Sequence, residues 1–188
     1  STNQENNSFV GENEVAGLKV SETFSHFLGG WLSHLRDLMP CFAPTVNSYK
    51  RYRSQSWAPT GCAWCPDNRT AGFRIVGEGQ SLRIECRIPG ADVNPYLAYA
   101  AAIAAGLEGL ESQTEAPPPL KGDAYQSQAG SLPASLREAT QLFESSSFVR
   151  KALGAAVVDH YSHFWLNESA AFDAAVTDWE RRRYFERI

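Results

Sequence analysis

Apolar residues recur at three- and four-residue intervals along much of the chain, which is the spacing of one face of an α-helix. The first such stretch begins at Ser21 and ends near Pro40, and its apolar positions are Phe24, Phe27, Leu28, Trp31, Leu32, Leu35 and Leu38. Gly29 and Gly30 lie inside this stretch and lower its helix propensity. We therefore expect another backbone to pass close to the helix at the two glycines.

A second helix is predicted over residues 96–110, where alanine is the commonest residue. Asn94 is a favourable N-cap, and Pro95 suits the first helical position. Because alanine allows close approach, we expect this helix to pack tightly against a sheet.

The C-terminal third of the chain also has a helical pattern. It predicts short helices over residues 133–144 and 147–153, a stop at Gly154, and helix from about residue 155 onward. The apolar positions of this last segment are Val157, Val158, Tyr161, Trp165, Phe172, Val176 and Trp179. We interpret its charged end, residues 179–184, as a solvated face. His160 and His163 lie close to the spacing of metal ligands, but without an acidic partner nearby we expect a structural role.

Residues 70–76 and 81–88 are rich in β-formers and flank the loop of residues 77–80, which predicts a β-hairpin. Alternation places Arg83, Glu85 and Arg87 on one face and Ile84, Cys86 and Ile88 on the other. A four-residue loop pairs Val76 with Ser81, and it sets Arg74 opposite Arg83. Like charges that face each other destabilise a sheet, so we expect an anion such as phosphate between them, with Glu85 binding its divalent cation. The alternative is a solvated face with Arg–Glu cross-strand pairs.

The other segments predict loops. Residues 1–14 are polar, residues 41–59 are irregular and rich in hydrogen-bond donors, and residues 113–129 contain three consecutive prolines and predict an extended surface connection. An irregular loop rich in donors, such as residues 41–59, often carries functional residues, and the alternative is a solvated connection.

Composition and charge narrow the class of protein. A chain of 188 residues with 43% hydrophobic and 12% aromatic content is typical of one globular domain. The formal net charge of -4 favours neither nucleic acid nor an anionic membrane as partner. Residues 50–87 reverse this balance, with seven basic against three acidic side chains, which indicates a small anionic ligand. The chain has no apolar run long enough to span a membrane and no signal-peptide pattern at its start, so we expect a cytoplasmic protein.

Four cysteines are too few for a disulfide scaffold of this size. Cys62 and Cys65 form the only close pair, without a second pair for zinc and without a following helix for redox chemistry. We expect reduced structural thiols, and a metal or redox role is the alternative.

Several motifs together resemble the C-terminal half of the glutamine synthetase catalytic domain. They are APTVNSYKR, WAP, NRTAGFRI, RIECR and NPYLAYAAAIAAGLEGL, in this order and at these spacings. The closing VTDWERRRYFERI resembles the end of the bacterial-type branch that includes gamma-glutamylputrescine synthetase. The likeness runs over nearly the whole chain.

The resemblance implies an ATP-dependent ligase with Mg²⁺ or Mn²⁺. Such an enzyme phosphorylates the side-chain carboxylate of glutamate to gamma-glutamyl phosphate, and ammonia or an amine then displaces the phosphate. By position, the resemblance implies that Arg69 stabilises the transferring phosphoryl group and that Glu85 binds the metal. It also implies that Arg51 and Arg87 bind glutamate and that Arg74 and Arg83 bind the ATP phosphates.

Two departures from the family pattern qualify this resemblance. Ammonium-using members carry a glutamate where this chain has Trp57, so the aromatic residue favours a bulkier amine and is a candidate for the amine site. The family's remaining metal ligands and its N-terminal β-grasp domain belong upstream of the part that this chain matches. One carboxylate does not hold the two or three cations of such a site.

We therefore interpret residues 1–188 as the C-terminal portion of a glutamine synthetase catalytic domain, without the β-grasp domain and inactive alone. The alternatives are a non-catalytic homologue with a structural or interaction role, and an unrelated phosphate-binding module. The expected fold is α+β, with antiparallel strands of a barrel-like sheet and outer helices. Family members form homo-oligomeric rings with active sites between subunits, so we also expect exposed apolar sheet area and a tendency to associate.

Overall fold

The computed structural model describes residues 6–127 and 130–187. Its helices are α1 (Glu22–His34), α2 (Met39–Phe42), α3 (Pro95–Glu111), α4 (Leu136–Ser145), α5 (Ser147–Leu153), α6 (Ala155–Ala174) and α7 (Asp178–Tyr184). Its strands are β1 (Asn13–Val15), β2 (Leu18–Val20), β3 (Trp64–Pro66), β4 (Phe73–Val76) and β5 (Arg83–Cys86), with 3₁₀ turns η1 (Ser48–Arg51), η2 (Gly79–Ser81) and η3 (Ala124–Gln126). The predicted α+β class is confirmed, but the described strands form two small open sheets and no closed barrel.

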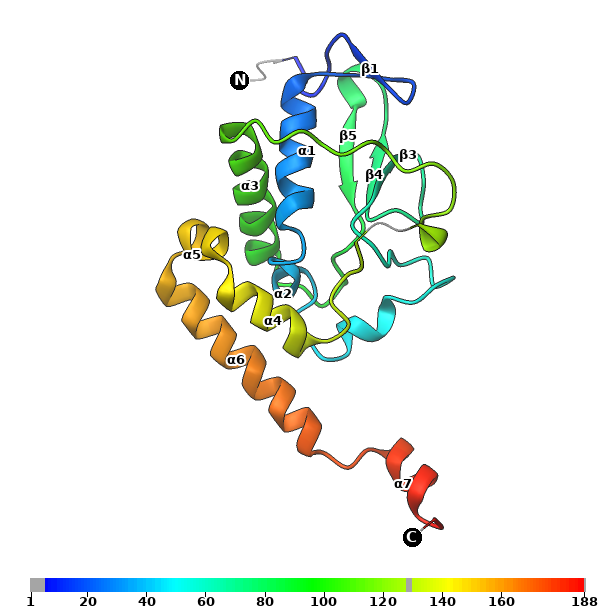
Figure 1. Ribbon diagram of the computed structural model, residues 1–188, viewed down its shortest axis with the longest axis vertical. Helices are drawn as coiled ribbons and strands as arrows, with labels where there is room; N and C mark the ends of the chain where they lie inside the picture. Colours follow the sequence, from blue (N-terminus) through cyan, green and yellow to red (C-terminus); the bar gives the residue numbers. More distant parts are fainter. Residues whose placement is uncertain (1–5, 128–129, 188) are drawn as a thin grey trace.

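Helix α1 lies between α3 on one side and the sheet of β3, β4 and β5 on the other (Figure 1). The Ser21 hydroxyl caps α1 by accepting from the backbone N–H of Phe24 at 3.1 Å. The helix ends at His34, earlier than the apolar spacing predicts, and a turn leads into α2, whose first turn contains Pro40. Leu28, Leu35 and Leu38 are fully buried, so α1 and the turn that leads into α2 lie at the centre of the core. No helix among the described residues is long and apolar enough to cross a membrane.

The glycines of α1 lie against another backbone, as predicted. A Cβ atom on Gly30 would lie 2.4 Å from the carbonyl oxygen of Ala105 and 2.4 Å from the Cα of Gly109, both in α3. The predicted cap of α3 is also confirmed, because the side chain of Asn94 accepts from the N–H of Tyr96 at 3.0 Å. The expectation that α3 packs against a sheet is wrong for its inner face, which lies on α1 (Figure 1).

The β4–β5 hairpin is confirmed, but its predicted register is wrong by two residues. Val76 pairs with Arg83, and Arg74 pairs with Glu85 instead of Arg83. The cause is local: η2 occupies the loop, where the Ser81 hydroxyl accepts from the N–H of Glu78 at 3.1 Å. These residues are therefore not available for strand pairing. A shift of two keeps every side chain on its predicted face.

Two further features of the sheets differ from the prediction. β3 pairs with β4 in parallel, so the sheet is not purely antiparallel. β1 and β2 form a hairpin over residues 13–20, so β1 begins inside the stretch 1–14 that the sequence predicts as a polar loop. Residues 1–5 of that stretch lie outside the described part. Its turn residues Ala16 and Gly17 have positive φ angles of 52° and 81°.

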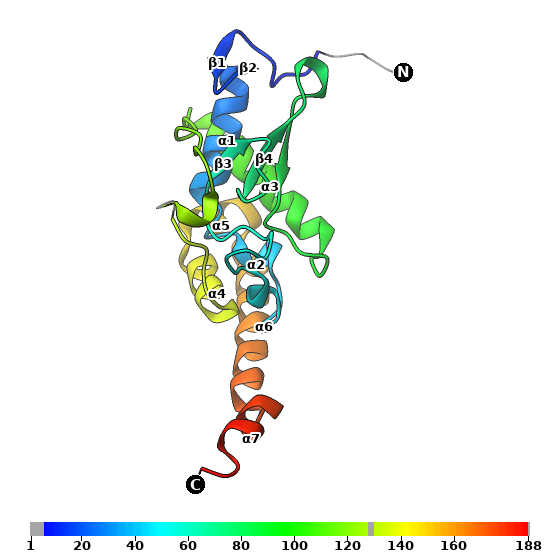
Figure 2. The same cartoon turned by 90° about the vertical axis from the view of Figure 1, so that its right-hand side faces the viewer.

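The predicted C-terminal helices are found as α4, α5 and α6, with Gly154 at a φ of 85° between the last two. The last predicted helix is interrupted, because Ala175 and Thr177 are extended and the chain resumes as α7, so Val176 lies outside both helices. α6 packs on α4, where Trp165 contacts Phe143, and α7 lies at the far end of an arm that leads away from the body (Figure 2). Segment 113–127 runs over the surface with η3 near its end, and residues 128 and 129 lie outside the described part. Exposed large apolar side chains lie mainly on helices α3, α6 and α7, which corrects the expectation of exposed apolar sheet area.

Candidate active site

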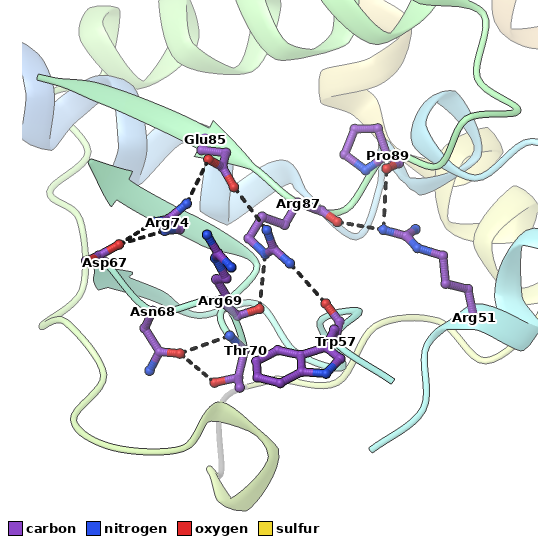
Figure 3. Close-up of polar contacts among 10 residues, drawn as sticks. All are labelled: Arg51, Trp57, Asp67, Asn68, Arg69, Thr70, Arg74, Glu85, Arg87 and Pro89. Carbon is purple, nitrogen blue, oxygen red and sulfur yellow. Dashed lines mark hydrogen bonds and ion pairs between the residues drawn. The ribbon is translucent and has the colours of Figure 1, made fainter. Parts of the chain in front are cut away.

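A hollow of about 510 Å³ lies beside β4 and β5 and is lined by Trp57, Arg69, Arg74, Glu85 and Arg87 (Figure 3). Arg74 projects from β4 and Glu85 from β5, while Arg87 directly follows β5. Arg69 belongs to the turn between β3 and β4, and Trp57 belongs to the loop after η1. Residues that are far apart in sequence thus meet at one place because the sheet and two loops converge there.

Glu85 lies between two of the arginines. Its Oε2 accepts from Nη1 of Arg74 at 3.2 Å, and its Oε1 accepts from Nη1 of Arg87 at 3.0 Å. The Arg–Glu cross-strand pair that the sequence left as an alternative is therefore present. It occurs at the wall of a hollow, however, and not on an open face of the hairpin.

Asp67 is a member of this network that the sequence analysis did not identify. Its Oδ1 accepts from Nε of Arg74 at 2.9 Å and from Nη2 of the same residue. The hydrogen bonds that Arg74 donates to Asp67, together with the charges of Asp67 and Glu85, raise the pKa of the Arg74 guanidinium. Asp67 directly follows β3, which pairs with β4, so its position could have identified it as a partner of Arg74. The sequence analysis does not predict the parallel β3–β4 pairing and therefore misses it.

Arg87 connects three segments of the site. Besides its bond to Glu85, its Nε donates to the carbonyl oxygen of Arg69 at 3.0 Å, and its Nη2 donates to that of Trp57 at 3.1 Å. Its guanidinium therefore holds both loops against the end of β5 (Figure 3). Two of its five N–H donors have no partner among the described residues and can meet a ligand.

Arg69 differs from its neighbours. Within the described residues, its guanidinium makes no hydrogen bond or ion pair, and it points between the guanidiniums of Arg74 and Arg87 (Figure 3). Three guanidinium groups and one carboxylate, Glu85, are among the described residues that line the hollow, and a second carboxylate, Asp67, pairs with Arg74 beside it. This excess of positive charge favours an anion with several acceptor oxygens.

Two predicted site residues lie outside the hollow. Arg51 donates from Nη1 to the carbonyl oxygen of Ile88 at 2.8 Å and from Nη2 to that of Arg87 at 2.7 Å, so it braces the chain after β5. Arg83 is exposed and donates from Nη1 to the carbonyl oxygen of Ser81 at 3.2 Å. The structure thus brings together five of the seven predicted site residues.

Asp92 is a second residue that the sequence analysis missed. Its Oδ2 accepts from the hydroxyl of Ser48 at 2.5 Å and from that of Thr45 at 3.1 Å, which fixes η1 and with it Arg51. Burial opposes ionisation, but these hydrogen bonds outweigh it and lower the pKa of Asp92. Thr45 and Ser48 are three residues apart, a spacing at which two hydroxyl side chains can bond to each other and to one acceptor. This spacing is a signal in the sequence for an acidic side chain that accepts from both hydroxyl groups.

The donor set fits phosphate better than it fits a complete metal site. Among the described residues, no cluster of three or more His, Cys, Asp or Glu side chains has the geometry to hold a metal ion. Of the described residues that line the hollow, Glu85 alone is a carboxylate, so it fits as one ligand of a cation whose other ligands come from elsewhere.

The cysteines and histidines take no part in this site. All four cysteines are free, and burial raises the pKa of the Cys62 thiol to about 11 and those of Cys41 and Cys86 to about 12. These values agree with structural thiols. His160 and His163 are exposed on α6, where His163 contacts the side-chain amide of Asn167 at 2.9 Å.

Comparisons with known proteins identify the family of the chain. The sequence profile of "Glutamine synthetase, catalytic domain" matches residues 1–184. The chain belongs to the glutamine synthetase family. Over 179 residues it is 50% identical to gamma-glutamylethanolamide synthetase of Streptomyces coelicolor, and the aligned region covers 95% of this chain and 39% of that protein. It is 38% identical over 173 residues to glutamate–isopropylamine ligase of a Pseudomonas species, covering 90% of this chain and 38% of that ligase.

Two solved structures have the same fold as this glutamine synthetase family chain. GmaS in complex with ADP superposes with a TM-score of 0.87 at 35% identity, over 98% of this chain and 44% of GmaS. GmaS without ligand gives a TM-score of 0.85 at 34% identity, over 98% and 42%. The chain thus spans about two fifths of the length of the relatives that it matches.

Proposed function

We propose that this chain forms part of an ATP-dependent ligase that joins the side-chain carboxylate of glutamate to ammonia or an amine. The observation that carries the proposal is the hollow with three guanidiniums around Glu85. Family membership supports it, and so do the names of two relatives, a gamma-glutamylethanolamide synthetase and a glutamate–isopropylamine ligase. ATP, when bound, supplies the phosphoryl group that activates the carboxylate.

In this proposal Arg69 stabilises the transferring phosphoryl group. Its guanidinium lies between two others and has no partner among the described residues, so its five donors are available without breaking another contact. Preplaced positive charge of this kind is what phosphoryl transfer requires, because negative charge spreads over the phosphoryl oxygens.

Arg74 and Arg83 are proposed to bind the ATP phosphates, and Glu85 to bind Mg²⁺ or Mn²⁺. Arg74 is favoured over Arg83, because it lines the hollow while Arg83 is exposed beside Ser81. Glu85 already pairs with Arg74 and Arg87, so a cation competes with these two guanidiniums for the same carboxylate.

Arg51 and Arg87 are proposed to bind glutamate. Arg87 lines the hollow with two donors that have no partner in the described part of the chain, and it needs no rearrangement to meet a carboxylate there. Arg51 would first have to release the carbonyl oxygens of Arg87 and Ile88. We therefore expect Arg87 to contribute more to glutamate binding than Arg51.

Trp57 is proposed to line the amine site. Its side chain is 67% exposed, and it also borders a second hollow of about 570 Å³ that contains Asp67 and Asp123. An alkylammonium group is attracted both by an indole face and by carboxylates. When this chain replaces the matching part of the Streptomyces synthetase, Trp57→Glu should move amine preference toward ammonium. An unchanged preference would count against this role.

The proposed protein is cytoplasmic and homo-oligomeric, with active sites completed between subunits. Exposed apolar side chains on α3, α6 and α7 support association. Neither nucleic acid nor membrane is proposed as a partner, since the chain carries a formal net charge of -4.

Calorimetric titration of the chain with ATP tests the proposal. Arg69→Ala and Arg74→Ala should each weaken binding about tenfold or more, because each removes charged hydrogen bonds of roughly 1.5–3 kcal/mol. Arg137→Ala is the matched control, since Arg137 pairs with Asp173 on the helical side of the molecule. Equal affinities for all four proteins, or no ATP binding by the unsubstituted chain at millimolar concentration, would refute the proposal.

A further inference from the structure

The backbone of Trp57 is strained. Its φ angle is 60°, and that of Gln55 is 64°, so both residues lie in the left-handed region that residues other than glycine rarely adopt. A strained conformation of this kind persists only where surrounding groups hold it. The loop that carries Trp57 therefore depends on the contacts that its backbone makes with the rest of the chain.

Two successive carbonyl groups of this loop accept hydrogen bonds from distant side chains. The Trp57 carbonyl accepts from Nη2 of Arg87 at 3.1 Å (Figure 3), and the Ala58 carbonyl accepts from the hydroxyl of Tyr125 at 3.0 Å. Arg87 lines the hollow beside β4 and β5, whereas Tyr125 is not among the described residues that line either hollow. Tyr125 thus holds the loop without meeting a ligand of either hollow.

Tyr125 belongs to a strap, residues 120–126, that is fixed to β3. The backbone N–H of Leu120 donates to the carbonyl of Trp64 at 2.9 Å, and the carbonyl of Leu120 accepts from Sγ of Cys65 at 3.0 Å. Figure 1 shows this part of the chain passing beside β3. Because β3 belongs to the same sheet as β4 and β5, the strap has a fixed position relative to the site.

The strap also fixes the turn that carries Arg69. The side-chain amide of Asn68 donates to the carbonyl of Gly122 at 2.7 Å, and the N–H of Ala124 donates to the hydroxyl of Thr70 at 3.0 Å. The residues on both sides of Arg69 are thus bonded to the strap.

The second hollow, of about 570 Å³, lies between these attachments. Trp57 and Arg69 border it, and Gly122 and Asp123 of the strap line it too. The strap therefore sets the separation between Trp57 and Arg69. In the proposed reaction an amine beside Trp57 must reach the carboxylate that is activated next to Arg69, and its position decides the rate of attack.

We propose that Tyr125 is a positioning residue for the amine substrate. Its hydroxyl fixes the Ala58 carbonyl and, through it, the strained backbone that presents the indole of Trp57 to the second hollow. Small primary alkylamines are the substrate class concerned, because their carbon chain packs on the indole, whereas ammonium has no carbon chain to place there. The inference rests on the proposed function in that Trp57 lines the amine site.

Fluorine NMR of this chain, labelled with 5-fluorotryptophan, tests the hold of Tyr125 on Trp57. The chain has five tryptophans, and Trp57→Phe assigns the signal of Trp57. Tyr125→Phe removes only the hydroxyl, and it should shift and broaden the Trp57 signal, because the loop then exchanges between conformations. Tyr161→Phe is the matched control, since Tyr161 is a half-buried tyrosine of α6 that contacts Trp165. This control should leave the Trp57 signal unchanged.

Steady-state kinetics of the chimeric enzyme, in which this chain replaces the matching part of the Streptomyces synthetase, test the consequence for the amine. Tyr125→Phe should raise KM for ethanolamine about fivefold, the ratio that corresponds to one hydrogen bond between uncharged groups. The KM values for ATP and glutamate should stay as they are in the unsubstituted chimera, because Asn68 and Thr70 still hold the Arg69 turn. A merely structural role of Tyr125 would change all three KM values together.

Three results would overturn the inference. They are a Trp57 signal that is the same with and without the Tyr125 hydroxyl, a change of that signal in the Tyr161→Phe control as large as in Tyr125→Phe, and an equal rise of KM for ethanolamine, ATP and glutamate. A chimera without activity leaves the decision to the fluorine signals, which need no turnover.

The inference and the proposed function fail separately. No ATP binding by the unsubstituted chain would refute the proposed function, whatever the fluorine signals show. ATP binding that depends on Arg69 and Arg74, together with a Trp57 signal that Tyr125→Phe does not move, would refute the inference alone.

Discussion

Gly30→Ala is expected to destabilise this chain although alanine is the better helix former. Gly30 lies inside α1, where alanine would by itself gain about 1 kcal/mol in helix propensity. The new Cβ would lie 2.4 Å from the Cα of Gly109 and 2.5 Å from its nitrogen. Both atoms belong to the backbone of α3, so no rotamer change relieves the overlap, and the two helices must separate.

The size of the effect follows from these opposing terms. Overpacking a core costs roughly 1–3 kcal/mol, and a clash with backbone belongs at the upper end. After the gain in propensity, a net loss of about 2 kcal/mol in the free energy of unfolding remains. For a chain of this size, about 1 kcal/mol corresponds to roughly 2–4 °C, so the melting temperature should fall by about 4–8 °C.

Urea denaturation followed by far-ultraviolet circular dichroism measures this change, and thermal melting gives an independent value. Ala100→Gly, on the exposed side of α3, is the control. It should cost about 1 kcal/mol through propensity alone. The two substitutions thus separate packing from propensity, since they are chemical opposites and both should destabilise. A Gly30→Ala chain as stable as the unsubstituted one would show that α1 and α3 do not touch there.

Three other predictions concern single contacts. Hydrogen bonds lower the pKa of Asp92 in the folded chain, so its ionised carboxylate stabilises the fold at pH values above the ordinary pKa of aspartate. This stabilisation is lost as the pH falls through the lowered pKa of the folded state. Asp92→Asn should therefore flatten the loss of stability between about pH 5 and pH 3 in urea titrations. The thiols of Cys41 and Cys86, with pKa values raised by burial to about 12, should react far more slowly with Ellman's reagent at pH 8 than in urea. Thr177→Ala removes a capping box and should reduce the helical signal of α7 without changing the main unfolding midpoint.

The sequence predicts those features of the fold that depend on neighbouring residues. Asn94 and Pro95 specify the start of α3 because a cap needs only the backbone of the next turn. Gly29 and Gly30 indicate a close backbone because glycine has no other advantage inside a helix. The identity of the partner, α3 instead of a sheet, depends on the whole topology, and no local pattern contains it.

The candidate site was predictable to the same extent. Alternation along β5 placed Glu85 and Arg87 on one face without knowledge of their partners. The parallel pairing of β3 with β4, which brings Asp67 to Arg74, joins segments through a turn that has no hairpin signal. Asp92 was missed for a related reason, since its hydroxyl partners Ser48 and Thr45 come from a distant loop.

The register error changes the argument for an anion without removing it. In the predicted register Arg74 faced Arg83, and an anion was needed to separate them. In the structure Arg74 faces Glu85, which neutralises that cross-strand pair. The unbalanced charge has moved to the other side of Glu85, where Arg69 is unpartnered within the described residues and Arg87 shares the same carboxylate. Glu85 and Asp67 together do not neutralise three guanidiniums, so the hollow retains an affinity for anions. That affinity should be centred on Arg69 and should depend less on Arg83, which lies outside the lining of the hollow.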